Sequence, residues 1–436
     1  MIEKMKNLKI KKAKGITLVA LVVTMVVLVI LAGVSISLVL GQYGIIGRAQ
    51  VAGETQRNAQ NLEEAYLQNA DLYIDEQIEK GIQSEIKSGE TATDENKTYN
   101  DGTDTAIIPK GFTVSGLSDE NKIANGLVIY DLGQTDTSSW NASYWLANKE
   151  TLQSTYNQFV WIPVASGEYT KCSTWNGVTK ENSTYETSTP EAEASKVYNK
   201  GGFYVARYEA GLASGISEHT SNIIHNYTYT NYNQSGVPQS KAGKVPWMFI
   251  NWTKSKANAE SMYNNNSNYN VESALITGTQ WDVILNKMLE KGKVTAGELT
   301  DSENWGNYRN KKLTYTGRLA EADNGTTNSG YWTLKPFATT VTTNGTKPTY
   351  SENNGALLTT GASSATQRYN IFDLAGNLWE WTDEVSYYNT NADYRVFRGG
   401  RYIDASSDYP ACYRNGNITV GFTNLSIGFR AVLYVK

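Results

Sequence analysis

The chain has 436 residues, 40% of them hydrophobic, so it can bury one large core or two ordinary ones. Its 39 Lys and Arg and 43 Asp and Glu give a net charge of −4, but six lysines and only one glutamate fall in residues 1–15. The rest of the chain is therefore acidic. An acidic body excludes binding to nucleic acid through its phosphates, which needs clustered Lys or Arg.

Cysteine and histidine are scarce in this sequence. Only two of each are present, Cys172, Cys412, His219 and His225. A disulfide framework normally shows more cysteines at regular spacing, so two unpaired thiols and one single bridge both stay open. A metal site built from several histidines is excluded.

Residues 16–40 contain no charged residue and directly follow the lysine-rich leader of residues 1–15. A helix over this stretch would be about 37 Å long at about 1.5 Å per residue, enough to cross a bilayer. It is longer than the apolar core of a cleaved secretory signal. Because the leader lysines stay cytoplasmic, we predict a single-pass protein of the bacterial cell membrane with its globular part at the cell surface.

The start of this apolar stretch, Lys14-Gly15-Ile16, resembles the N-terminus of a type IV prepilin. The resemblance implies cleavage between Gly15 and Ile16 by prepilin peptidase and methylation of the new N-terminus. The sequence differs from most pilins at the fifth mature residue, where Ala20 replaces the usual Glu. In that family the Glu aids subunit docking, so its absence argues against assembly with other pilins more than against cleavage. A plain signal anchor is the alternative to prepilin processing.

Three patterns follow the apolar stretch. Apolar residues recur at three- and four-residue steps within residues 41–83, which predicts a stalk helix. Residues 84–106 are rich in Ser, Thr, Gly, Asp and Glu and predict a flexible linker. Residues 107–157 contain the apolar run 127–130 and predict a small β-rich segment, either separate from the next domain or continuous with it.

Residues 158–436 alternate short apolar runs with long polar loops, which predicts an α+β domain with short strands. We expect strands at 159–164 and 202–208. Helices are expected at 253–263 and at 279–289, the second with Thr279 as its N-cap.

The sharpest signal is three blocks near the C-terminus. They read YNIFDLAGNLWEWT at 369–382, RVFRGGRY at 395–402 and IGFRA at 427–431. Together, and in this order, they resemble the sulfatase-modifying factor (formylglycine-generating enzyme) domain, with the resemblance covering 158–435. This resemblance implies a C-type-lectin-like fold.

Physical roles can be assigned within these blocks. Trp379 and Trp381 flank Glu380, so in a strand the two indoles share one face and the carboxylate takes the other. Arg430 is expected to be a buried structural partner of a carboxylate or carbonyls, because a buried arginine must be paired.

The enzymatic members of this family hold copper with a pair of cysteines just after the Gly-Gly block and oxidise a substrate cysteine. Here Cys412 stands near the second of these positions, whereas Asp404 occupies the place of the first. One thiol cannot make the paired site that a cuprous ion prefers. We therefore expect no copper and a non-catalytic binding module. An oxidoreductase that acts on cysteine through Cys412 is the alternative.

The same resemblance implies a structural calcium ion at the turn from Asp373 to Glu380. Its ligands would be these two carboxylates and the carbonyls of Gly376 and Leu378. Calcium takes about six to eight oxygens and mixes carboxylates with carbonyls. The alternative is that Asp373 and Glu380 only cap turns or pair with arginines.

Variable proteins of diversity-generating retroelements also use this domain and vary residues between the Gly-Gly and Gly-Phe-Arg blocks. That interval is 401–427 here, and its Tyr, Asn, Asp and Ser are typical of adaptable binding loops. We predict that this interval binds an extracellular protein or glycan, whether or not a retroelement diversifies its sequence. The other alternative is that the whole protein is a structural minor pilin. The predicted ligand-binding residues are Tyr402, Asp404, Ser406, Asp408, Tyr409, Tyr413, Asn415, Asn417, Phe422 and Asn424.

Overall fold

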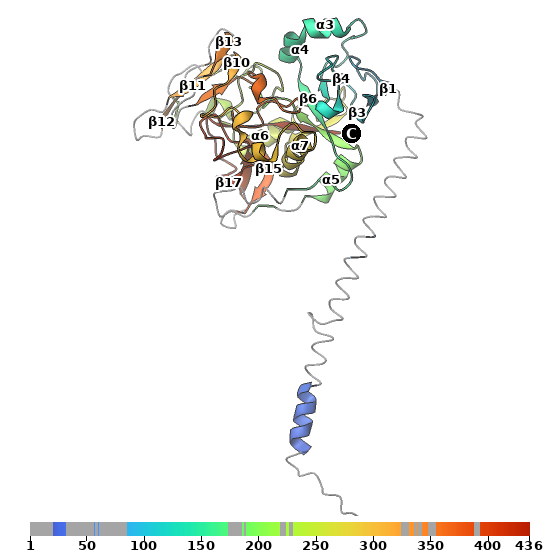
Figure 1. Cartoon of the computed structure of the whole chain (residues 1–436), viewed down its shortest axis with the longest axis vertical. Coiled ribbons are helices and arrows are strands. Elements are labelled where there is room, and N and C mark those ends of the chain that lie inside the picture. Colours follow the sequence, from blue (N-terminus) through green and yellow to red (C-terminus); the bar gives the residue numbers. More distant parts are fainter. Residues whose placement is uncertain are drawn as a thin grey trace, which may run out of the picture. The chain divides into compact units, whose positions relative to one another are not determined.

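The computed structural model divides the chain into two units, Met1–Glu79 and Lys80–Lys436, which are described separately (Figure 1). The residues that the structure describes are 21–31, 56, 60, 85–172, 185–186, 189–218, 224–225, 230–323, 331–334, 337, 342–347, 355–387 and 393–436.

In the N-terminal unit, residues 21–31 form a helix whose apolar side chains are exposed. The rest of the predicted span at 16–40, the predicted cleavage site and nearly all of the predicted stalk helix lie outside the described residues. Among the residues that are described, no helix is both long enough and apolar enough to cross a membrane.

A six-stranded sheet forms the centre of the C-terminal unit, in the order β4-β5-β6-β7-β19-β9. Its middle strands are rich in β-branched and aromatic residues and are buried along nearly their whole length, as expected for strands covered on both faces. The six are β4 (Thr113–Val114), β5 (Val128–Tyr130), β6 (Gln158–Pro163), β7 (Gly202–Ala206), β19 (Ala431–Val435) and β9 (Val271–Leu275).

The pairing of β5 with β6 answers one question that the sequence left open. Strand β5 comes from the predicted segment 107–157 and β6 opens the predicted domain 158–436, yet the two strands are neighbours in one sheet. The β-rich segment is therefore continuous with the main domain.

The prediction of a flexible linker at 84–106 is wrong. These residues contain β1 (Glu85–Ile86), β2 (Lys97–Asn100) and the start of β3 (Thr105–Ile108), which form a three-stranded sheet. The few apolar side chains of this stretch are buried in the core, and its polar residues build turns. Asp101, for example, accepts backbone hydrogen bonds from Thr103 and Asp104. The polar composition of this stretch does not show that its polar side chains make specific turn contacts, so it could not be told from a linker.

A second, four-stranded sheet has the order β17-β16-β15-β18, with β15 antiparallel to β16 and parallel to β18. Successive side chains of its strands point to opposite faces. One face carries Trp379, Trp381 and Phe397, whose rings pack together. The four strands are β15 (Trp379–Ser386), β16 (Tyr394–Arg398), β17 (Arg414–Thr419) and β18 (Ile427–Phe429).

Two helices lie beside β15, α6 (Trp252–Glu260) and α7 (Gly278–Glu290) (Figure 1). Both were predicted within a few residues. The expected N-cap of α7 was wrong, because Thr277 and not Thr279 caps it. Thr277 accepts from the backbone N–H of Gln280 and the Gln280 side chain accepts from that of Thr277, which makes a capping box.

The remaining elements surround these two sheets. The other helices and 3-10 turns are α3 (Ala142–Ala147), α4 (Lys149–Thr155), α5 (Glu191–Tyr198), α8 (Ala296–Thr300), η1 (Ile123–Asn125), η3 (Thr230–Tyr232), η4 (Ser302–Asn304) and η5 (Ser364–Thr366). The other strands form a pair, β10 (Thr314–Gly317) with β13 (Thr342–Thr346), and a sheet of β14 (Ala356–Leu358), β11 (Leu319–Asp323), β12 (Tyr331–Leu334) and β8 (Ile224–His225).

Candidate ligand-binding pocket

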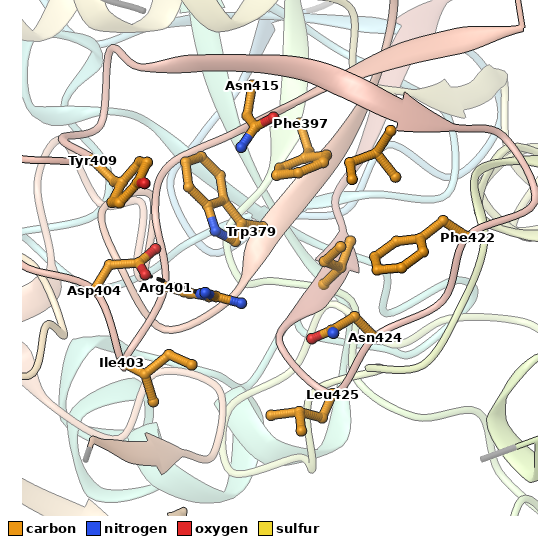
Figure 2. Close-up of a pocket in the computed structure, with 12 residues that line it drawn as sticks. Trp379, Phe397, Arg401, Ile403, Asp404, Tyr409, Asn415, Phe422, Asn424 and Leu425 are labelled. Atoms are coloured by element: carbon orange, nitrogen blue, oxygen red, sulfur yellow. Dashed lines mark hydrogen bonds and ion pairs between the residues drawn. The ribbon is translucent and has the colours of Figure 1, made fainter. Parts of the chain in front are cut away.

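A pocket of about 330 Å³ lies on the aromatic face of the four-stranded sheet (Figure 2). All four strands contribute a side chain to it, and two loops complete its wall. Ten of its twelve lining residues come from the interval 401–427. The lining residues are Trp379, Phe397, Arg401, Ile403, Asp404, Tyr409, Asn415, Ile418, Phe422, Asn424, Leu425 and Ile427.

The start of this interval is fixed to the rest of the domain by close backbone packing. Gly399 and Gly400 have φ values of 94° and 74°, which L side chains rarely adopt. A Cβ on Gly400 would stand 2.2 Å from the carbonyl oxygen of Tyr409. Further along, the Trp281 indole of α7 donates to the carbonyl of Ala411 over 3.0 Å. The loop is therefore held at several points by conformation and hydrogen bonds.

Trp379 sits at the centre of the pocket's aromatic floor. Its ring centroid lies 5.0 Å from that of Phe397, 5.6 Å from that of Tyr409 and 5.8 Å from that of Tyr413. Such edge-to-face and tilted arrangements stabilise aromatic pairs beyond their buried area. The floor is thus a packed cluster that needs no ligand to hold its shape.

The polar side of the pocket centres on an ion pair. The Arg401 Nε donates to Asp404 Oδ1 over 3.0 Å (Figure 2). Its Nη1 donates to Ser426 Oγ over 2.9 Å. Burial raises the pKa of the Asp404 carboxyl, and the Arg401 charge opposes this rise. Asp404 also lines an adjoining pocket of about 140 Å³ together with Arg309 and Asp408.

The structure brings half of the ten predicted ligand-binding residues into the 330 Å³ pocket: Asp404, Tyr409, Asn415, Phe422 and Asn424. Asp408 lines only the adjoining pocket, and Asn417 lines neither. Tyr402, Ser406 and Tyr413 are buried outside the lining. The Tyr413 side chain is only 2% exposed and packs against the rings of Trp379 and Tyr409.

Seven lining residues were missed from the sequence. The sequence assigned Trp379 only to the core, but its ring packs in the core and also lines the pocket. The period-two pattern around Trp379 could have indicated this face, because Phe397 and Asn415 share it through strand pairing. The missed residues are Trp379, Phe397, Arg401, Ile403, Ile418, Leu425 and Ile427.

The opposite face of the sheet is ionic and closed. Arg398 Nη2 donates to Asp282 of α7 over 2.9 Å, and Arg414 pairs with the other oxygen of the same carboxylate. Arg414 also lies 3.3 Å from Glu384, which reaches Lys171 at 3.4 Å. These fully or nearly buried charges pair with one another and fix the sheet against α7, so we read them as structural.

The thiol of Cys412 lies in the core and outside the lining of the pocket. Burial raises the pKa of this thiol to about 11. The thiolate is the nucleophile and the metal ligand, so burial and a raised pKa both disfavour reaction and metal binding at this thiol. Both Cys412 and Cys172 are free, and Cys172 is only partly buried.

The two carboxylates among the predicted calcium ligands, Asp373 and Glu380, already have protein partners. Both oxygens of Glu380 accept from Arg430, at 3.0 Å to Nε and 2.6 Å to Nη2. Asp373 accepts from the Gly361 N–H and the Thr366 hydroxyl at 2.8 and 2.7 Å. A guanidinium at Glu380 does not fit a neighbouring calcium ion, so this arrangement favours the alternative of arginine pairing. It also confirms that Arg430 is buried and paired.

Comparison with known proteins identifies the domain. The family model "Sulfatase-modifying factor enzyme 1-like domain" matches residues 90–435. No curated protein matches the chain. Two solved structures show weak similarity. "Crystal Structure of CarF" is 14% identical, with a TM-score of 0.29, and the match covers 54% of this chain and 87% of that chain. Treponema denticola variable protein 1 is 13% identical, with a TM-score of 0.24, and the match covers 58% of this chain and 100% of that chain. Similarity at these TM-scores carries no weight for function. The family match covers nearly all of the C-terminal unit, and the chain belongs to the sulfatase-modifying factor family.

Proposed function

We propose that this protein is a binding member of its family and uses the 330 Å³ pocket to hold an extracellular ligand. One observation carries the proposal: the interval 401–427 supplies ten of the twelve lining residues, while the domain core fixes its start. A pocket that combines aromatic walls with a few placed polar groups is the usual form of a ligand site.

The chemistry of the interval supports binding over cysteine oxidation. The position expected for the first copper-binding cysteine is Asp404, which is engaged with Arg401. The second, Cys412, is buried with a raised pKa. A thiol pair able to hold a cuprous ion is therefore missing from this segment.

We further propose that residues 16–40 anchor the domain in the cell membrane and that prepilin peptidase cleaves after Gly15. The support is the uncharged run behind a basic leader. Diversification of 401–427 by a retroelement is part of the same proposal. An adjacent reverse transcriptase gene with a near-copy of the segment that encodes 401–427 would support it, and a neighbourhood without these would contradict it.

The test blocks the pocket. The full chain, reconstituted in fluorescent lipid nanodiscs, is titrated onto intact bacterial and epithelial cells. Asn415→Trp places a bulky ring at the pocket wall, and Thr419→Trp is the matched control on the exposed end of the same strand. We expect Asn415→Trp to lose binding and Thr419→Trp to keep it, with both variants folded by near-UV circular dichroism. Equal binding by the two would contradict the proposal.

A further inference from the structure

We propose that the pocket ligand is a sugar unit of a glycan, that is, an uncharged ring that is rich in hydroxyl groups. This inference rests on the proposed binding function and adds the chemical class of the ligand. Three features of the pocket lead to it: its acceptors without partners, its balanced charge and its apolar lining.

Two buried acceptors at this pocket have no hydrogen-bond partner among the described residues. They are Asp404 Oδ2 and Asn415 Oδ1. Asp404 is 7% exposed, and its carboxylate points toward Arg401 at the pocket wall, with Oδ1 already taken by that arginine (Figure 2). A buried acceptor without a donor destabilises the structure, so a ligand that brings N–H or O–H groups relieves this cost. A purely apolar ligand does not.

The charge of the pocket is balanced. Arg401 and Asp404 are the only ionic side chains in its lining, and they pair with each other. The adjoining pocket shares this pair and adds Arg309 and Asp408, which again balance. An ammonium or carboxylate ligand would have to compete with these existing partners. Hydroxyl groups can donate to the free acceptors without adding charge, so the balance favours an uncharged donor.

The apolar part of the lining suits the C–H faces of a sugar ring. Tyr409 and Phe422 present partly exposed aromatic rings above the nearly buried Trp379 and Phe397, and aliphatic side chains such as Ile403 and Leu425 lie beside them (Figure 2). A pocket of about 330 Å³ is at the lower end of small-ligand sites, which start at about 300 Å³. A site of this size fits one or two rings of a glycan better than a broad protein epitope.

The test uses a printed array of neutral, N-acetylated and acidic glycans, probed with the full chain in a detergent without a sugar headgroup. Bound glycans are then titrated in free form by tryptophan fluorescence. We expect neutral glycans to bind. Asn415→Ala should weaken this binding about five- to tenfold, since one hydrogen bond is lost. Thr419→Ala, on the exposed end of the same strand, should stay within about twofold.

The outcomes separate this inference from the proposed function. If no glycan binds but deglycosylated surface proteins do, and Asn415→Ala weakens that binding, the pocket binds protein and the sugar inference is overturned while the proposed function stands. If glycans bind and Asn415→Ala has no effect, the sugar site lies elsewhere and the inference is again overturned. If neither glycans nor cell surfaces are bound, both proposals fail.

Discussion

Replacing Arg430 by methionine tests the central charge arrangement of the domain. Arg430 is fully buried and donates to both oxygens of Glu380, and also to the carbonyls of Ala206 and Phe372 over 3.0 and 2.8 Å. Breaking a buried pair by removing one partner typically costs about 3–5 kcal/mol, because it leaves an uncompensated charge. We expect a loss of this size at pH 7 in urea unfolding of the full chain.

The loss should depend on pH. Burial raises the pKa of Glu209, Asp373 and Glu380, and the Arg430 charge opposes this rise. Without Arg430 these pKa values rise further, so the folded variant binds protons that the unfolded chain has already lost. The stability of Arg430→Met should therefore fall more steeply than that of the wild type as the pH rises from about 4 to 7.

Two variants serve as controls for Arg430→Met. Arg430→Lys keeps a positive charge and should lose less stability. Adding Glu380→Gln to Arg430→Met removes the carboxylate that is left without a partner. The double variant should recover part of the lost stability, as expected when two residues interact. A loss below about 1 kcal/mol for Arg430→Met, or one that does not change with pH, would show that Arg430 does not hold these buried carboxylates in their charged form.

Three further predictions follow from single sites. Burial raises the pKa of Asp131 from 3.8 to about 6, against opposing hydrogen bonds from Tyr263 and Asn157. Because the folded-state pKa is raised, the free energy of unfolding falls as the pH rises from about 4 to about 6. At about 1.36 kcal/mol per pKa unit, the fall is about 3 kcal/mol. Asp131→Asn should remove this part of the pH dependence. Chelator should leave the melting temperature unchanged if Glu380 pairs only with Arg430, whereas a clear drop would support the calcium prediction. Mass spectrometry of membrane-bound protein should find a methylated Ile16 at the N-terminus, and a retained leader would indicate a plain signal anchor.

The parts of the fold that could be predicted from sequence depend on local pattern. Continuous apolar runs identified β5, β6 and β7, because strands buried on both faces leave that signature. The alternation at Trp379, Glu380 and Trp381 correctly predicted a two-faced strand, with the indoles against Phe397 and the carboxylate on Arg430.

The features that the sequence did not predict depend on contacts between distant parts of the chain. Residues 84–106 look like a linker, yet Tyr99 and Ala106 are buried through pairing of β2 with β3. Likewise, the interval 401–427 was predicted to bind a ligand, but its composition could not separate buried Tyr413 from Tyr409, which lines the pocket. Both rings pack against Trp379, but only that of Tyr409 also lines the pocket. The difference lies in the three-dimensional path of the loop, which has no local signal in the sequence.

We propose that the segment after Gly399-Gly400 builds a binding pocket and not a redox centre. The most direct measurement is mass spectrometry of a cysteine-containing peptide incubated with the full chain, cuprous ion and oxygen. We expect no more aldehyde-containing peptide than in a mixture without the protein, because Cys412 is a single buried thiol. Conversion of the peptide thiol to an aldehyde that is abolished by Cys412→Ser would contradict it.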